Sequence, residues 1–170
     1  MNRKRTEYRL KYSVMAALFA AMIYVLTAFV HIPTGQGYIH VGDGLICLAA
    51  ALLPAPYAVC AGAIGAGLSD FLSGYALWVL PTIIIKSITA LLFTSKQEHI
   101  ICRRNIIGVM LAMPVCVGGY YLAGGLLYGD FAAALADVPT NIIQTVASAA
   151  VFVLFGRAMD RLRVKWWLAK

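Results

Sequence analysis

Charge is scarce in this chain of 170 residues: only 12% of them are charged, whereas a typical soluble domain has about a quarter. Hydrophobic residues make up 62% of the sequence. The charge-free runs are 12–42, 44–69, 71–85, 106–129 and 138–156. Several of them exceed the ~20 residues that cross a hydrocarbon layer as a helix. The composition therefore excludes a soluble fold and predicts an integral membrane protein.

The motifs of common catalytic and metal sites are also missing. The four cysteines form no CxxC pair, which argues against a disulfide framework or a zinc site. No glycine frame precedes Lys86, so the chain cannot hold ATP phosphates itself, and there is no HExxH pair. Asp43 and Asp70 resemble the pair of an aspartyl membrane protease, but the nearby Lys86 would hold them ionised. We expect no catalytic residue, cofactor or metal, with an intramembrane enzyme as an alternative.

Proline, glycine and charged residues divide the chain into apolar segments of helical length. The pattern predicts one all-α transmembrane domain, 1–170, built as a six-helix bundle. The helices are expected at about 9–30, 43–53, 57–72, 78–95, 106–128 and 139–162.

The basic residues are distributed unevenly over the predicted loops. With six spans, thirteen of the fourteen Lys and Arg residues lie at the two termini or in the 96–105 loop, which share one side of the membrane. The opposite loops carry Asp130 and Asp137 instead. The positive-inside rule therefore predicts cytoplasmic N and C termini. Because membrane topology explains the net charge of +7, nucleic-acid binding is not expected.

The remaining basic residue, Lys86, lies about five residues inside its predicted helix, roughly 7–8 Å below the outer surface. An unpaired lysine inside a membrane is costly, so a carboxylate partner is expected. Asp70 and Asp43 both lie at predicted outer helix ends. The pair could be structural, or the charge could meet a polar ligand.

Other polar and aromatic residues also fall in the outer half of the predicted bundle. They come from the glycine-rich 31–41 loop and from the last two helices. Amides inside a lipid-spanning helix need hydrogen-bond partners, which neighbouring helices or a bound ligand could provide. A ligand cavity there would have one aromatic and one polar wall. The candidate substrate-binding residues are Tyr38, His40, Asp43, Lys86, Tyr120, Tyr121, Asn141 and Gln144.

The first predicted helix carries a stripe of small residues. Ala16 and Ala20 are four residues apart, and so are Ala17 and Ala21. Small residues let helices approach closely in a membrane. From spacing alone, the stripe could face another helix of the bundle or a partner protein.

With these features in order, the chain resembles the substrate-binding S components of energy-coupling factor (ECF) vitamin transporters. It is most similar to the branch for hydroxymethylpyrimidine, pyridoxine and related precursors. Besides the alanine stripe, the resemblance rests on Gly37-Tyr38-Ile39-His40-Val41-Gly42-Asp43, Ser69-Asp70, Pro81-Thr82-Ile83-Ile84-Ile85-Lys86, Gly118-Gly119-Tyr120-Tyr121 and Pro139-Thr140-Asn141-Ile142-Ile143-Gln144.

The resemblance implies a multi-pass protein of a prokaryotic plasma membrane that binds a vitamin-like heterocycle near its outer face, with the first loop as a lid. It also implies that the alanine stripe docks on a membrane-embedded T component, which is coupled to two cytoplasmic ATPases that drive toppling of the S component. The expected substrates are pyridoxine, hydroxymethylpyrimidine or thiamine-like molecules. The alternatives are an S component for a deazaguanine queuosine precursor and an autonomous small secondary transporter.

Overall fold

The computed structural model describes residues 3–33 and 38–169, and most of them are helical. The four long helices are α1 (Arg3–Ala28), α3 (Ala55–Leu72), α5 (Arg103–Tyr128) and α7 (Val138–Arg161). The shorter elements are α2 (Gly42–Leu52), η1 (Ala76–Trp78), α4 (Val79–Leu91), α6 (Phe131–Ala134), η2 (Leu135–Asp137) and α8 (Val164–Ala169). Between α1 and α2, β1 (His31–Pro33) pairs antiparallel with β2 (Tyr38–His40).

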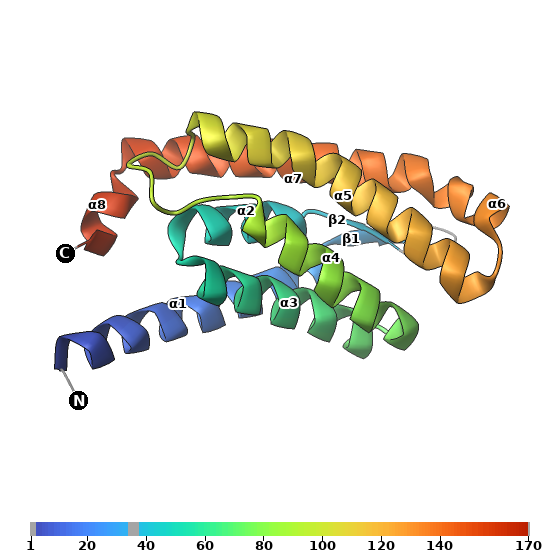
Figure 1. Ribbon diagram of the computed structural model, residues 1–170, viewed down its shortest axis with the longest axis horizontal. Helices are drawn as coiled ribbons and strands as arrows, with labels where there is room; N and C mark the ends of the chain where they lie inside the picture. Colours follow the sequence, from blue (N-terminus) through green and yellow to red (C-terminus); the bar gives the residue numbers. More distant parts are fainter. Residues whose placement is uncertain (1–2, 34–37, 170) are drawn as a thin grey trace.

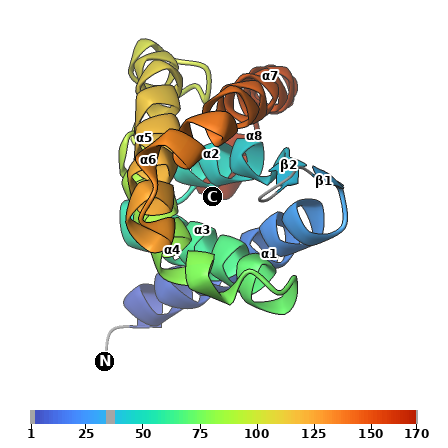
Figure 2. The ribbon, with the colours of Figure 1, turned by 90° about the vertical axis from the view of Figure 1, so that its right-hand side faces the viewer.

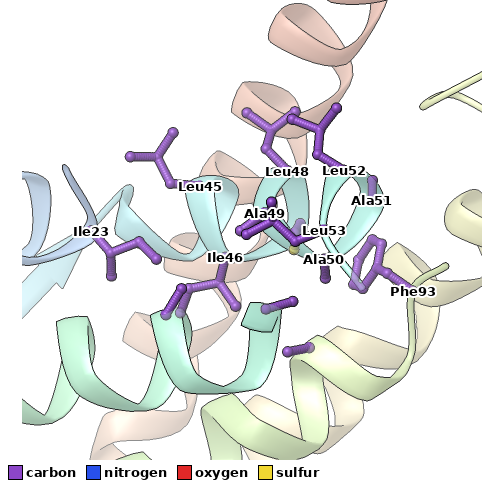
Figure 3. Close-up of a cluster of buried hydrophobic side chains, with 14 of the residues drawn as sticks. Ile23, Leu45, Ile46, Leu48, Ala49, Ala50, Ala51, Leu52, Leu53 and Phe93 are labelled. Atoms are coloured by element: carbon purple, nitrogen blue, oxygen red, sulfur yellow. The ribbon is translucent and has the colours of Figure 1, made fainter. Parts of the chain in front are cut away.

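Helix α2 occupies the centre of the bundle. Figures 1 and 2 show it between the α5–α7 side and the α1–α3–α4 side, and it contacts α1, α3, α4 and α7. All eleven of its residues are buried. This burial suits a helix that is apolar on nearly every face. Figure 3 shows its side chains meeting Ile23 of α1 and Phe93, and the Phe93 ring packs edge-on against Phe152 with ring centroids 5.3 Å apart.

The outer surface of the bundle suits lipid. Large apolar side chains such as Leu126 and Leu154 are 76% and 69% exposed. Among the described residues, four segments are long and apolar enough to cross a membrane: Arg5–Ala28, Ala55–Leu72, Arg103–Tyr128 and Phe131–Arg161. Gly42–Leu52 and Ala76–Leu91 are apolar but shorter. These features describe a membrane protein, while the expected count of six spans stays a prediction.

Both chain ends lie at one end of the bundle, together with the 92–102 segment (Figure 1), and we call this the basic end. Contacts between distant parts of the chain hold it together. The Lys165 amine donates to the backbone oxygens of Ser95 and Gln97, and the Lys11 amine donates to that of Leu168. The predicted basic loops therefore gather in space. Their cytoplasmic location remains a prediction.

The structure corrects two expectations about loops. The 31–41 segment, expected to be an irregular loop in an all-α fold, contains the β1–β2 hairpin, in which His31 lies opposite His40. The 129–138 segment contains α6 and η2. Helix α6 forms because the Asp130 carboxylate accepts hydrogen bonds from the backbone of Ala132 and Ala133 at 2.8 and 3.0 Å.

Helix α4 ends at Leu91, whereas we expected it to continue to about residue 95. Buried Asn105 explains the difference. Its side-chain oxygen accepts from the Thr94 N–H at 2.8 Å, and its amide donates to the backbone oxygens of Thr94 and Ile100. These bonds satisfy the backbone of a turning chain, so the segment after α4 need not be helical.

Candidate functional site

An ion pair between Lys86 of α4 and Asp43 of α2 lies inside the bundle. The Lys86 amine is 2.8 Å from Asp43 Oδ2, and the two side chains are 0% and 5% exposed. Of the two carboxylates considered from the sequence, Asp43 is therefore the partner. Asp43 does not cap α2, because Val41 holds the N-cap position. A carboxylate in the first helical turn is nevertheless stabilised by the helix dipole.

Gln144 of α7 joins this pair. Its amide donates to Asp43 Oδ2 at 3.1 Å, so one carboxylate oxygen receives two side-chain donors. Asp43 Oδ1 is buried without a hydrogen-bond partner among the described residues, and so is the hydroxyl of Ser148, one turn further along α7. Buried polar atoms are normally satisfied. The cluster therefore retains hydrogen-bonding capacity that a ligand could use.

Aromatic rings cover the other side of Lys86. Its amine lies 4.8 Å from the centroid of the Tyr120 ring, and the Tyr120 hydroxyl is 3.1 Å from Thr82 Oγ1. The ring of Trp78 lies 5.8 Å from that of Tyr120, and its N–H donates to the Tyr128 hydroxyl at 3.1 Å. The cluster thus has an aromatic wall from η1 and α5 and a polar wall from α2 and α7.

Sequence reasoning missed two residues of this wall. Neither Trp78 nor Thr82 was among the candidate site residues. Both precede Lys86 at intervals of four, so all three share one face of the helical segment. That spacing, combined with the need of Lys86 for neighbours, was the signal that could have found them.

His40 lies beside the start of α2 and is buried. Its Nδ1 accepts a hydrogen bond from the Gly42 N–H at 3.2 Å, which requires the neutral ring. Burial, together with nearby Lys86 and His31, lowers the pKa of His40 to about 4, although Asp43 opposes this shift. His40 is therefore neutral at pH 7, and its other nitrogen carries a proton.

Three expected substrate-binding residues are not placed in this cluster by their described contacts. The Tyr121 ring packs edge-on against Phe131 at 5.8 Å. Asn141 donates to the backbone oxygen of Asp137, within its own helix turn. The Tyr38 backbone pairs with Pro33 in the hairpin, and the Tyr38 side chain lies outside the described part of the structure.

The alanine stripe of α1 is divided between two environments. Ala16 is buried in the core at 8% exposure. Ala20 faces α3, because a Cβ on Gly65 would come within 2.6 Å of the Ala20 backbone oxygen. Ala17 and Ala21 are exposed. Half of the stripe therefore packs inside the bundle, and half is available to lipid or a partner.

Three findings relate this chain to known proteins. Residues 8–161 match the family model described as "ECF-type riboflavin transporter, S component". A protein of Pyrococcus woesei, described as an uncharacterized protein in a gap 3' region, is 30% identical over 131 residues, or 75% of this chain and 86% of the relative. The fold is similar to a solved S component of a bacterial ECF transporter, with a TM-score of 0.72, 18% identity, and coverage of 91% of this chain and 98% of the other.

Proposed function

The chain belongs to the family of ECF-type riboflavin transporter S components, and on this basis we propose that it captures a small water-soluble vitamin or vitamin precursor at the outer membrane face for uptake. The family consists of transporter components, so the chain is not an enzyme. An autonomous transporter and a deazaguanine-specific S component are not favoured by this family. The observation that carries the proposal is the family match across residues 8–161.

The buried cluster supports a planar nitrogen heterocycle as the ligand. Tyr120 and Trp78 offer ring faces for stacking, while Asp43 Oδ1 offers an acceptor to a ring N–H or an amino group. The ligand site is thus built from Asp43, Lys86, Tyr120 and Gln144, with His40 at its edge. The family name points to riboflavin, whereas the motif resemblance points to pyridoxine, hydroxymethylpyrimidine or a thiamine-like molecule.

The site lies at a depth that suits capture from one side. Gln144 is six residues from the start of α7, or about 9 Å, and Tyr120 is eight residues from the end of α5, or about 12 Å. Both helix ends lie opposite the basic end (Figure 1). If the basic end faces the cytoplasm, the site is reached from outside.

Titration calorimetry on the purified protein tests the proposal and separates the candidate substrates. Riboflavin, pyridoxine, hydroxymethylpyrimidine and thiamine are titrated separately, with a deazaguanine base as the fifth ligand. One vitamin or precursor should bind far more tightly than the others. Failure of every heterocycle to bind, together with binding of a lipid, would overturn the proposal.

A matched pair of variants on α7 tests the site. Gln144→Leu removes an amide that contacts Asp43, whereas Asn141→Leu removes an amide that bonds within its own helix. We expect Gln144→Leu to weaken ligand binding at least about tenfold, as loss of a hydrogen bond to a charged group does. Asn141→Leu should change it by less than about threefold. Equal losses would place the ligand elsewhere.

We further propose that Ala17 and Ala21 dock on a membrane-embedded T component that works with two cytoplasmic ATPases. Their exposure on α1 and the small-residue spacing support this assignment. Replacing both with Leu should abolish uptake in cells that contain the whole transporter while leaving ligand binding unchanged. If ligand binding is lost as well, this face stabilises the bundle. Uptake in vesicles without T component and ATPases would favour an autonomous transporter.

A further inference from the structure

A cavity of about 700 Å³ lies at the basic end, away from the Asp43–Lys86 cluster. Its walls come from α1, the end of α2, the 92–102 segment, the end of α7 and α8, and they include Tyr12 and the apolar Leu52. Small-molecule sites in proteins typically enclose roughly 300–1,000 Å³. The cavity is therefore large enough to hold a polar headgroup and the first atoms attached to it.

Three basic side chains line the cavity: Lys96, Arg163 and Lys165. Within residues 3–33 and 38–169, none of the three forms an ion pair. Lys165 donates to two backbone oxygens, and an ammonium group has three donors, so one N–H remains for another acceptor. Burial lowers the pKa of Lys165, although Cys102 and Asp160 oppose this effect. An anion in the cavity would offset that cost.

The two acidic residues of the lining do not cancel this arrangement. Asp160 uses one carboxylate oxygen for the N–H of Ile100 at 2.7 Å and the other for that of Ile101 at 2.9 Å. Both carboxylate oxygens of Asp160 are therefore bonded to the backbone of the 92–102 segment, which forms part of the cavity wall. Glu98 is exposed and forms no ion pair in the part of the chain that the structure describes.

Arg163 lies in the turn between α7 and α8, where the chain changes direction at the basic end (Figure 1), and its side chain lines the cavity. Its φ of 52° is the positive value of a left-handed residue, unusual for any residue other than glycine. Just beyond it, Trp166 and Trp167 are 51% and 65% exposed. Tryptophan is typical of the membrane–water interface, so the cavity is expected to lie at headgroup depth.

We propose that this cavity binds the phosphate headgroup of an anionic phospholipid in the adjacent leaflet. Basic pockets between membrane helices on the cytoplasmic side recognise such headgroups. The combination of a partly open cavity, three basic side chains and neighbouring exposed tryptophans favours a lipid over a soluble anion. This site is independent of the transported ligand.

Quenching of tryptophan fluorescence by brominated lipids tests the proposal on the full chain in detergent micelles. Trp166 and Trp167 report on the cavity, whereas the remaining tryptophan, Trp78, bonds to Tyr128 at the end of α5, which lies away from the basic end (Figure 1). Brominated phosphatidylglycerol should quench at a much lower mole fraction than brominated phosphatidylcholine. Equal quenching by the two lipids would overturn the proposal.

A charge-matched pair of double variants sharpens the test. Lys96→Gln with Arg163→Asn removes two cavity charges, and Asn tolerates the left-handed backbone. Each basic residue near an anionic surface contributes about fivefold, so the preference for phosphatidylglycerol should fall about thirtyfold. Arg103→Gln with Arg104→Gln removes the same charge outside the cavity and should change it by less than threefold. Equal losses in both pairs would refute a specific site.

Competition separates the possible sources of the anion. Glycerol 3-phosphate at millimolar concentration should not displace brominated phosphatidylglycerol, because it lacks the acyl chains. Displacement by that soluble molecule would assign the cavity to a soluble phosphate. Displacement by a soluble acidic peptide would instead indicate a protein partner, and either result would overturn the lipid assignment. Circular dichroism checks that each variant folds, and Lys96→Gln alone repeats the test if the double variant does not.

Discussion

Removing one partner of the buried Asp43–Lys86 ion pair should destabilise the protein strongly. In Lys86→Met, the Asp43 carboxylate stays 95% buried and, among the side chains that the structure describes, keeps the Gln144 amide as its donor. Breaking a buried pair in this way typically costs about 3–5 kcal/mol. Asp43→Asn leaves the ammonium of Lys86 facing the Tyr120 ring, and a desolvated cation–π contact recovers about 2 kcal/mol at most.

The double variant Asp43→Asn with Lys86→Met provides the decisive comparison. It removes both charges, and neutral replacement of a buried pair is often close to neutral for stability. We therefore expect the double variant to be at least about 2 kcal/mol more stable than Lys86→Met alone. Its recovery would show that the cost lies in the charge left unpaired.

Reversible unfolding in mixed detergent and dodecyl sulfate micelles, followed by far-ultraviolet circular dichroism, measures these free energies. Arg104→Met is the control, because it removes the same charge from an exposed position outside the cavity and should change stability by less than about 0.5 kcal/mol. If Lys86→Met stays within about 1 kcal/mol of the wild type, water reaches the pair and the reasoning fails. Additive losses in the double variant would refute the coupling between the two residues.

Three further predictions use the same unfolding assay. The pKa of His40 is about 4 in the folded state, against an ordinary value of 6.5. The free energy of unfolding should therefore be undiminished above pH 6.5 and should fall by up to about 3 kcal/mol as the pH drops toward 4. His40→Gln should remove this dependence on pH. Gly65→Ala should lower the free energy of unfolding by about 1–3 kcal/mol, because the added Cβ forces α3 away from the Ala20 backbone. The added Cβ of Gly118→Ala meets nothing within 4 Å, so this variant should stabilise α5 by about 0.5–1 kcal/mol. Equal effects of the two variants would contradict the packing of α1 against α3. Asp160→Asn should lower the free energy of unfolding by about 1–3 kcal/mol, because it leaves one backbone N–H of the 92–102 segment unsatisfied. It should also speed hydrogen exchange of the backbone amides in that segment. Unchanged exchange would show that Asp160 does not hold the segment.

Some features of the candidate site could be predicted from the free energy of placing single polar residues inside a membrane. Lys86 had to find a carboxylate because a lone ammonium is expensive inside a membrane, and the structure provides one. The choice between Asp43 and Asp70 could not follow in the same way. Both stand at predicted helix ends, and only the central position of α2 brings one of them to 2.8 Å.

The sequence also could not decide which of two nearby residues of similar type contacts the Asp43–Lys86 pair. Tyr120 and Tyr121 are adjacent, so they point about 100° apart on the helix, and only Tyr120 faces Lys86. Asn141 and Gln144 share a face. The shorter Asn141 side chain bonds within its own helix, while the longer Gln144 side chain reaches Asp43.

Composition and charge order alone were enough to predict lipid as the solvent, the helical class and the gathering of basic residues at one end of the bundle. These properties depend on sums over many residues, and no single contact can reverse them. The partner of Lys86, the inward-facing half of the alanine stripe and the cavity at the basic end emerged only when the helices were packed together. Periodicity specifies which side chains share a helix face, but the rotation and depth of each helix are set by its neighbours.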